Sequence, residues 1–436
     1  MIWVGIDDTD APDRGCTTWA LTELVRVARS RGFDLIGPPR LVRLNPNVPW
    51  RTRGNAALAA RFGRGQGAPW TVGEIDGVPV EAWQRSSPLR PQERNELVDA
   101  LWARVRAVAP RVRRTDPALV ASDRPLPSAL YWAAVRTIVR IRPLVESLDR
   151  WGVDHRHRGA LRGLVGASAA LAWPARRVTW ELIAYRPSSE WGTSRVVDAR
   201  SVRAAQEAVP ELFLCHDPRT RRLLITPHTA CPILYGLRGT TPEAPLAARA
   251  WVRSEPVDRW MLFRTNQATG DHLVDRSAAE LRGYRSGYVT GTVSSPPLTV
   301  AGGHVRFDLT DRALVRLPCV SFEPTKTLPT AARRLLPGDR LRVWGSWGRS
   351  GRGAAVRLEG FDVLAVTSVG RWVPPTCPRC RGKSRSLGTG RGWRCDRCRR
   401  RWPPEAASWE PRERGLRRGT FHPTPSARRH LAPLAR

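Results

Sequence analysis

The stretch IWVGIDDTDAPDRGCTTWALTELVRVA, residues 2–28, decides the fold class of the N-terminal region. Its apolar start, residues 2–6, predicts a buried strand. The helix that follows is predicted from apolar residues at helical spacing, which are Leu21, Leu24, Val25 and Ala28. Thr17 and Thr18 lie where the N-cap of this helix is expected. The turn between strand and helix carries three carboxylates, Asp7, Asp8 and Asp10, and in α/β folds such a turn binds phosphates and metals.

Strands and helices alternate from there to about residue 268. Apolar periodicity and flanking prolines predict helices over residues 91–109 and 128–148. Strand-like runs cover residues 40–44, 178–185 and 223–226. This alternation indicates α/β or α+β domains.

From residue 288 the pattern changes to short strands. They are expected over residues 288–293, 304–309, 313–322, 340–344 and 354–363, with a short helix over residues 330–336 between the third and the fourth. This is the layout of an OB-fold β-barrel. Trp344, Trp347 and the many arginines suit base stacking and phosphate contacts, and a barrel used only as a spacer is the alternative.

Four cysteines form the most specific motif of the chain. Cys377-Pro-Arg-Cys380 is separated by fourteen residues from Cys395-Asp-Arg-Cys398. Two such knuckles can close a tetrahedral site, and four thiolates leave no open coordination position. The spacing therefore predicts a structural zinc ribbon, with a redox pair or an iron–sulfur cluster as the alternative.

The net charge of +33, with 72 Lys and Arg against 39 Asp and Glu, indicates a polyanionic partner. We expect a cytosolic protein, because the apolar run over residues 163–173 is too short to cross a bilayer and no signal peptide precedes Asp7. Lys326 and Lys383 are the only lysines beside 70 arginines, so they are candidates for specific RNA contacts, with chance as the alternative. The segment 404–436, rich in Arg and Pro, is expected to be a mobile, anion-seeking tail or merely a solvated one.

The carboxylates of the first turn have two interpretations. Three acidic residues within four positions repel one another and suit an RNA-binding surface poorly, unless a divalent cation such as Mg²⁺ lies between them and a phosphate. An ordinary turn followed by a capped helix is the other interpretation.

Several longer strings, in order along the chain, resemble the archaeal tRNA(Ile2) 2-agmatinylcytidine synthetase family. They are GIDDTD and GCTT near the N-terminus, RLVRLNPNVPWRTRGN (40–55), TWELIAYR (179–186), HTACPILYGLRG (228–239), FRTNQATGDH (263–272), EPTK (323–326) and the zinc ribbon with Lys383-Ser384. The resemblance implies a multidomain α+β protein with a kinase-like α/β domain, a ferredoxin-like domain, an OB-fold β-barrel and a C-terminal zinc ribbon. It implies an ATP-dependent ligase that replaces the C2 oxygen of cytidine 34 of tRNA(Ile2) with agmatine, so that the tRNA reads AUA.

The resemblance also implies roles for single residues. Thr18 matches the family's phosphorylated threonine, and Asp7, Asp8 and Asp10 match the carboxylates that arrange ATP and Mg²⁺. The chemistry is consistent, because the C2 oxygen becomes a leaving group only once ATP has activated it. Gly15 allows close approach to a phosphate at the helix start. Asn55, which follows Gly54, either contacts phosphate or forms a turn.

We expect domains over residues 1–172 (kinase-like), 173–268 (ferredoxin-like), 285–366 (OB fold) and 372–403 (zinc ribbon). Glu181 and Asp271 are candidates for holding the agmatine guanidinium, although each is equally a solvated charge. The principal rival is a non-catalytic OB and zinc-ribbon protein that binds nucleic acid. A third reading is a generic ATP-dependent RNA ligase or kinase.

Overall fold

The structure is a computed structural model that describes residues 1–434 except 12–13, 53, 113–114 and 351–352. The predicted first strand is β1 (Ile2–Asp7), which lies between β4 (Ala56–Gln66) and β8 (Ala118–Ser122) and pairs antiparallel with both. Its side chains alternate between two cores: Ile2, Val4 and Ile6 belong to one, and Trp3 to the other. This alternation makes β1 a central strand with helices on both faces.

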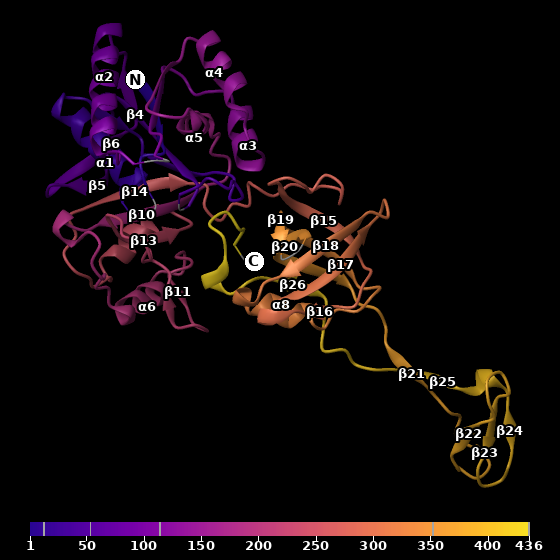
Figure 1. Ribbon diagram of the computed structural model, residues 1–436. Helices are drawn as coiled ribbons and strands as arrows, with labels where there is room; N and C mark the ends of the chain where they lie inside the picture. The colour runs from indigo at the N-terminus through magenta and orange to yellow at the C-terminus, as the bar shows by residue number, and fades with distance from the viewer. Residues whose placement is uncertain (12–13, 53, 113–114, 351–352, 435–436) are drawn as a thin grey trace.

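Helices cover the two faces of this sheet, as Figure 1 shows. On one face α1 (Thr17–Ser30) packs beside α2 (Pro91–Val108), which confirms both predicted helices. On the other, α5 (Arg162–Ala172) lies against β1 and contacts α3 (Ser128–Arg136).

The single helix predicted over residues 128–148 is wrong. The structure has two helices, α3 and α4 (Ile141–Arg150), and Thr137 between them has extended backbone. Pro143 lies in the first turn of α4, where a missing N–H costs nothing, whereas in one continuous helix its ring would clash with the carbonyl of residue 139.

One sheet runs through the whole region up to residue 268. In the described part of the chain its order is β13-β10-β14-β5-β6-β2-β4-β1-β8-β9, with β3 and β7 off this path. The further strands are β2 (Asp34–Ile36), β3 (Arg40–Arg43), β5 (Trp70–Ile75), β6 (Val78–Trp83), β7 (Arg85–Ser87), β9 (Asp154–His157), β10 (Thr179–Tyr185), β13 (Ile233–Gly239) and β14 (Arg259–Thr265). Because β14 pairs with both β5 and β3, the regions expected as separate domains share a sheet and a core. Outside the sheet are α6 (Ala199–Ala208), α7 (Glu243–Arg249), β11 (His216–Asp217) and β12 (Arg222–Leu223).

The predicted barrel is present. Its five strands are β15 (Ser286–Val293), β17 (Val305–Asp311), β18 (Arg316–Ser321), β19 (Arg340–Ser350) and β20 (Gly353–Ala365). They close as β15-β17-β18-β20-β19 and back to β15, and the β18–β20 pairing is parallel. The short helix α8 (Thr327–Ala332) lies between the third and fourth strands, as predicted, and β16 (Leu298–Thr299) extends the sheet beside β17.

A two-stranded stem connects the barrel to the zinc ribbon. It consists of β21 (Gly370–Val373) and β25 (Ser408–Pro411), and the ribbon between them contains β22 (Ser384–Ser386), β23 (Trp393–Cys395) and β24 (Arg401–Trp402). In Figure 1 the stem and ribbon project away from the rest of the molecule.

The mobile tail expected over residues 404–436 is wrong for the described residues up to 434. After the stem, Leu416 is buried in the barrel core, and β26 (Gly419–Phe421) pairs with β20. The chain then reaches the N-terminal region, where the Ala268 N–H donates to the His430 carbonyl at 2.7 Å and Leu431 is buried in the same core as Trp3. The sparse apolar residues of this segment pack onto two other domains, so the segment needs no core of its own. We call residues 419–432 the C-terminal strap.

No helix within the described ranges is both long and apolar enough to span a membrane.

Candidate functional site

Two adjacent cavities occupy the region where the acidic turn meets the rest of the sheet. The first, of about 630 Å³, is lined by Asp7, Asp8 and Asp10, and we call it the carboxylate cavity. The second, of about 480 Å³, is lined by Thr18 and is called the threonine cavity. Asp10, Gly54 and Ala56 line both. The structure therefore brings together the acidic turn, Thr18 and the segment at Gly54, which the sequence motifs singled out separately.

The acidic turn is shaped by its own hydrogen bonds. Asp8 has a left-handed backbone (φ 57°), and its N–H donates to Oδ1 of Asp7 at 2.7 Å. Oδ2 of Asp8 accepts from the Asp116 N–H at 3.2 Å, and Oδ2 of Asp10 accepts from the Thr52 hydroxyl at 3.1 Å. Burial raises the pKa of Asp8 to about 7, and burial together with the Asp8 charge raises the pKa of Asp7 well above its usual range. Burial thus disfavours the ionised forms of Asp7 and Asp8.

Two residues of α5 that no motif indicated, Arg162 and Gly166, line the carboxylate cavity. The Arg162 guanidinium lies 4.2 Å from the ring centroid of half-exposed Trp50 and contributes favourable charge to Asp8. On the same helix, Gly166 faces the Asp7 carboxylate. Asn55 also lines this cavity, and its side-chain amide donates to the Asn45 carbonyl at 2.9 Å.

Thr18 is the second residue of α1 and does not cap it. The N-cap is Cys16, with extended backbone and no side-chain cap bond, so the cap predicted at Thr17 or Thr18 is wrong. The Thr18 hydroxyl instead lies 3.0 Å from the Cys16 sulfur and lines the cavity near the start of the helix. Gly15, at φ 71°, makes the sharp turn into this helix, which is where backbone N–H groups favour an anion.

The opposite wall of the threonine cavity carries a buried charged cluster. Glu181 accepts from Arg43 at 3.3 Å and from Arg238 at 3.1 Å. His430 of the C-terminal strap lies beside this cluster, and the charge of Arg43, burial and the charge of Arg238 hold its pKa well below the usual value, so the ring is neutral. Glu181, a candidate from sequence for holding the agmatine guanidinium, thus lines this cavity and is paired with two arginines of the protein.

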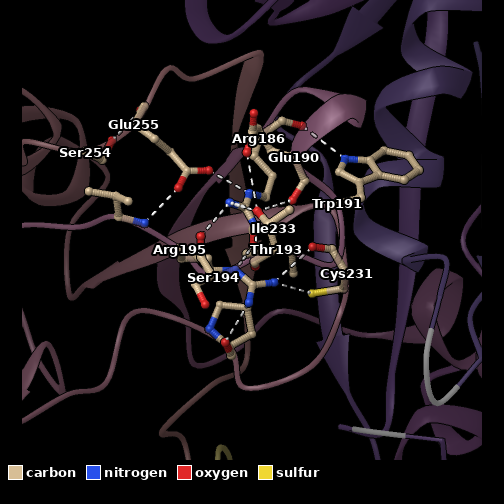
Figure 2. A network of polar contacts seen from close by, with 12 residues as sticks. Arg186, Glu190, Trp191, Thr193, Ser194, Arg195, Cys231, Ile233, Ser254 and Glu255 are labelled. Atoms are coloured by element: carbon tan, nitrogen blue, oxygen red, sulfur yellow. Dashed lines mark hydrogen bonds and ion pairs between the residues drawn. The ribbon is translucent and has the colours of Figure 1, made fainter.

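A network centred on two arginines fixes another wall, the loop over residues 226–231 (Figure 2). Arg195 donates to three carbonyls of this loop, at 3.1 Å to Pro227, 2.8 Å to Thr229 and 3.0 Å to Cys231, and at 2.7 Å to the carbonyl of Ile233 at the start of β13. Arg186, which is fully buried, pairs with Glu255 at 2.6 Å, and Glu255 accepts from the Val196 N–H beside Arg195. No sequence pattern pointed to Arg195, because its partners are backbone carbonyls brought close only by folding.

Other candidate residues lie away from both cavities. Trp344 is only 3% exposed and packs against Tyr288 and His422, so its predicted stacking on bases is wrong and it is a core residue. Asp271 is buried and accepts from the Tyr131 hydroxyl at 2.5 Å, which makes it structural. Lys326 is exposed on the barrel and pairs with Glu323. Lys383 is exposed on the zinc ribbon.

The four cysteines of the ribbon converge. Their sulfur atoms all lie within 4.8 Å of one another, with Cys377 to Cys398 at 3.4 Å and Cys380 to Cys395 at 3.5 Å. A tetrahedral zinc with bonds of about 2.3 Å separates its sulfurs by about 3.8 Å, so the thiols fit zinc closely. Hydrogen bonds within each knuckle hold this arrangement, including one from the Arg381 N–H to the Cys377 carbonyl at 2.8 Å.

Comparison with known proteins agrees with this geometry. Family models described as the TiaS TCKD domain, the TiaS FLD domain and the TiaS C-terminal zinc ribbon domain match residues 3–159, 162–272 and 374–413. The tRNA(Ile2) 2-agmatinylcytidine synthetase TiaS of Archaeoglobus fulgidus is 34% identical over 100% of this chain and 97% of its own length. A solved TiaS–tRNA(Ile2)–ATP complex superposes with a TM-score of 0.81 at 32% identity, covering 99% of this chain and 95% of that one. A TiaS–tRNA(Ile2)–AMPCPP–agmatine complex gives 0.80 at 30% identity, covering 99% and 96%. The chain belongs to the TiaS family of tRNA(Ile2) 2-agmatinylcytidine synthetases.

Proposed function

We propose that this protein is an ATP-dependent ligase that joins agmatine to C2 of cytidine 34 in tRNA(Ile2). Membership of the family and the solved complexes of relatives with tRNA(Ile2), ATP and agmatine support this activity. The observation in this chain that carries it is the pair of adjoining cavities, one lined by carboxylates and the other by Thr18. A passive nucleic-acid binder has no use for partly buried, mutually repelling carboxylates, and this disfavours the non-catalytic rival.

ATP and Mg²⁺ fit the carboxylate cavity. Burial raises the pKa values of Asp7 and Asp8 and so disfavours their ionised forms, which a divalent cation would stabilise. We assign Asp7, Asp8 and Asp10 to this cation. When bound, Mg²⁺ neutralises the phosphate charge that develops during phosphoryl transfer.

Thr18 is the proposed phosphate acceptor of the neighbouring cavity. It lies at the start of α1, where the backbone N–H groups and the helix dipole stabilise negative charge, and Gly15 keeps the approaching turn close. Asp10 and Gly54 line both cavities, so the proposed acceptor and the proposed ATP site adjoin each other. Asn55 supports the Gly54 segment through its bond to Asn45.

The barrel and the zinc ribbon hold the tRNA. The ribbon segment 374–407 has ten Lys and Arg against two acidic residues, and Lys383 lies exposed on it. Lys326 is exposed at the edge of the barrel. We propose that both lysines contact the RNA backbone, that the thiols bind one structural zinc, and that the protein works in the cytoplasm.

The finer domain assignment is also a proposal. Residues 1–172 and 173–268 form the kinase-like and ferredoxin-like domains, followed by an OB fold over 285–366 and the zinc ribbon over 372–403. The helix-covered sheet around β1 and the antiparallel β13-β10-β14 group with α6 and α7 support the first two labels. The strap over residues 419–432 then belongs to none of the four.

The direct test is a labelling assay. Protein, ATP, labelled agmatine and a tRNA(Ile2) transcript are incubated, and label at position 34 is measured by nuclease mapping. Label should require ATP and should be absent when the transcript carries U34. A protein that binds the transcript but attaches no agmatine would be the non-catalytic rival, and ATP consumption without dependence on an amine would indicate a generic RNA kinase.

A further inference from the structure

Two tryptophans face each other across the stem. Trp372 of β21 pairs in register with Trp409 of β25, and their ring centroids are 5.4 Å apart at an interplanar angle of 68°. Trp372 is 64% exposed and Trp409 is 43% exposed. Tryptophan is usually well buried, so two adjacent exposed rings on one surface indicate a binding site.

The stem gives these rings no core to join. It has two strands, and most of its side chains are exposed. The ring of Trp409 lies over Gly370, where an added Cβ would be 2.7 Å from the indole. Cross-strand contact therefore fixes the pair in position but leaves much of the indole surface in solvent. An edge-to-face pair covers one ring face only, and the open face of the other ring can accept a flat partner.

The charge around the pair identifies that partner. The ribbon beyond the stem carries a net charge of +8 over residues 374–407, from ten basic and two acidic residues. In and next to the stem strands, Arg371 pairs with Glu410 at 3.4 Å and Arg412 is exposed. An exposed aromatic surface beside a strongly basic segment has the composition of a single-strand nucleic-acid site, where arginines follow the backbone and indoles stack on bases. A protein partner with an apolar face would not need this charge.

We propose that the Trp372–Trp409 pair is a stacking platform for an unpaired base of the bound RNA. The proposal rests on the proposed function, since the RNA is the tRNA substrate, and it assigns the site to the stem. Paired bases are excluded, because a duplex offers no open base face along its length. The platform replaces Trp344, which is buried, as the aromatic contact to RNA.

The test compares tRNA affinity in the full-length protein. Trp372→Ala combined with Trp409→Ala should weaken tRNA binding about 10-fold or more, because stacking on an indole contributes strongly per base. The double Phe variant should retain most of the affinity. Trp251→Ala is the matched control, since Trp251 is 49% exposed but lies after α7, far along the chain from the stem, and it should bind normally.

Salt dependence separates stacking from a displaced ribbon. Loss of stacking removes no phosphate contact, so the slope of log Kd against log salt concentration should stay at the wild-type value. A shallower slope in the double Ala variant would mean that the ribbon's arginines had moved and would overturn the proposal. Unchanged tRNA affinity of the double Ala variant would also overturn the proposal. If the sedimentation coefficient of that variant then differed from the wild-type value, the two tryptophans would form a contact between protein chains instead. Wild-type protein that binds tRNA without attaching agmatine would count against the proposed function and leave the platform intact.

Discussion

Gly166 leaves room for the carboxylate of Asp7: a Cβ added to Gly166 would lie 1.8 Å from Oδ2 of Asp7. The glycine is inside helix α5, where glycine ordinarily weakens a helix. The helix axis can therefore pass close behind the acidic turn, and Asp7 is held between its own strand and this helix. The position of the first carboxylate depends on a residue about 160 positions away in sequence.

Gly166→Ala should lower activity by ~10²-fold, because displacing a reacting group by about 1 Å has that effect. Helix propensity alone would stabilise the variant by about 1 kcal/mol. A lower melting temperature together with lost ATP turnover would show that the clash of the added Cβ with Asp7 outweighs the gain in helix propensity. Gly353→Ala is the control, since nothing lies within 4 Å of its added Cβ. A more stable and fully active Gly166→Ala protein would contradict the proposed role.

Thr18→Val should lose phosphate labelling from γ-labelled ATP while melting close to wild type. The Thr18 hydroxyl does not cap α1, so its removal does not carry the ~1 kcal/mol cost of a lost cap. Thr18→Ser keeps the hydroxyl and should keep the label, which mass spectrometry can locate. A Thr18→Val protein that still makes agmatinylcytidine at nearly the wild-type rate would remove Thr18 from the reaction.

Asp8→Asn should abolish ATP consumption and leave tRNA affinity unchanged, because the carboxylate acts on the phosphate and not on the RNA contacts. In the absence of Mg²⁺, the same substitution should make the folded protein more stable at neutral and higher pH. The pKa of Asp8 is about 7 in the folded protein against 3.8 ordinarily, so the wild type loses stability as pH rises from about 4 to 7. The variant should therefore be the more stable protein above pH 7 and gain nothing near pH 4. Equal stability of both proteins at pH 8 would contradict this.

Zinc removal should unfold the ribbon alone. Cys395→Ser should lose the metal, measured by elemental analysis at one zinc per chain in the wild type, since a closed thiolate site draws much of its folding energy from the metal. The sheet and barrel have their own cores, so their melting should be unchanged. Cys319 is a buried cysteine of the barrel, outside the zinc site, so Cys319→Ser is the control. Zinc-free wild-type protein with full tRNA affinity would exclude a role for the ribbon in binding.

Arg195→Lys should loosen the wall of the threonine cavity. A lysine ammonium cannot reproduce the fork that bonds four carbonyls, and each partly buried carbonyl left without a donor costs about 1–3 kcal/mol. The expected result is lower stability and a raised KM with kcat less affected, measured by the labelling assay. Exposed Arg200→Lys on α6 should match the wild type. Unchanged KM would mean that the loop holds its shape without Arg195.

Local patterns were enough to predict most elements. The strand at residues 2–6, the helices starting at Thr17 and Pro91, the five barrel strands and the zinc ribbon follow from periodicity, proline positions and cysteine spacing. These features depend on neighbours in sequence. The break at Thr137 was missed because the apolar pattern continues across it, although Pro143 marks it.

The site was predictable only in part, because its walls come from distant segments. Asp7, Asp8, Asp10 and Thr18 stood out by motif, whereas Arg162, Gly166 and Arg195 act through contacts made by folding. The burial of Trp344 does not follow from composition, because it arises from packing against Tyr288 and His422, which lie on other parts of the chain. The strap was misjudged for the same reason, since its few apolar residues pack onto cores formed elsewhere.

The C-terminal strap imposes an order on biosynthesis. Residues 425–430 line the threonine cavity together with Thr18, and the ribosome makes them after the barrel and the zinc ribbon. A nascent chain can thus fold its N-terminal sheet and bind nucleotide long before the threonine cavity has its full wall. We expect a chain that a nonsense mutation ends before residue 425 to lack this part of the cavity wall while it keeps the four cysteines of the zinc ribbon.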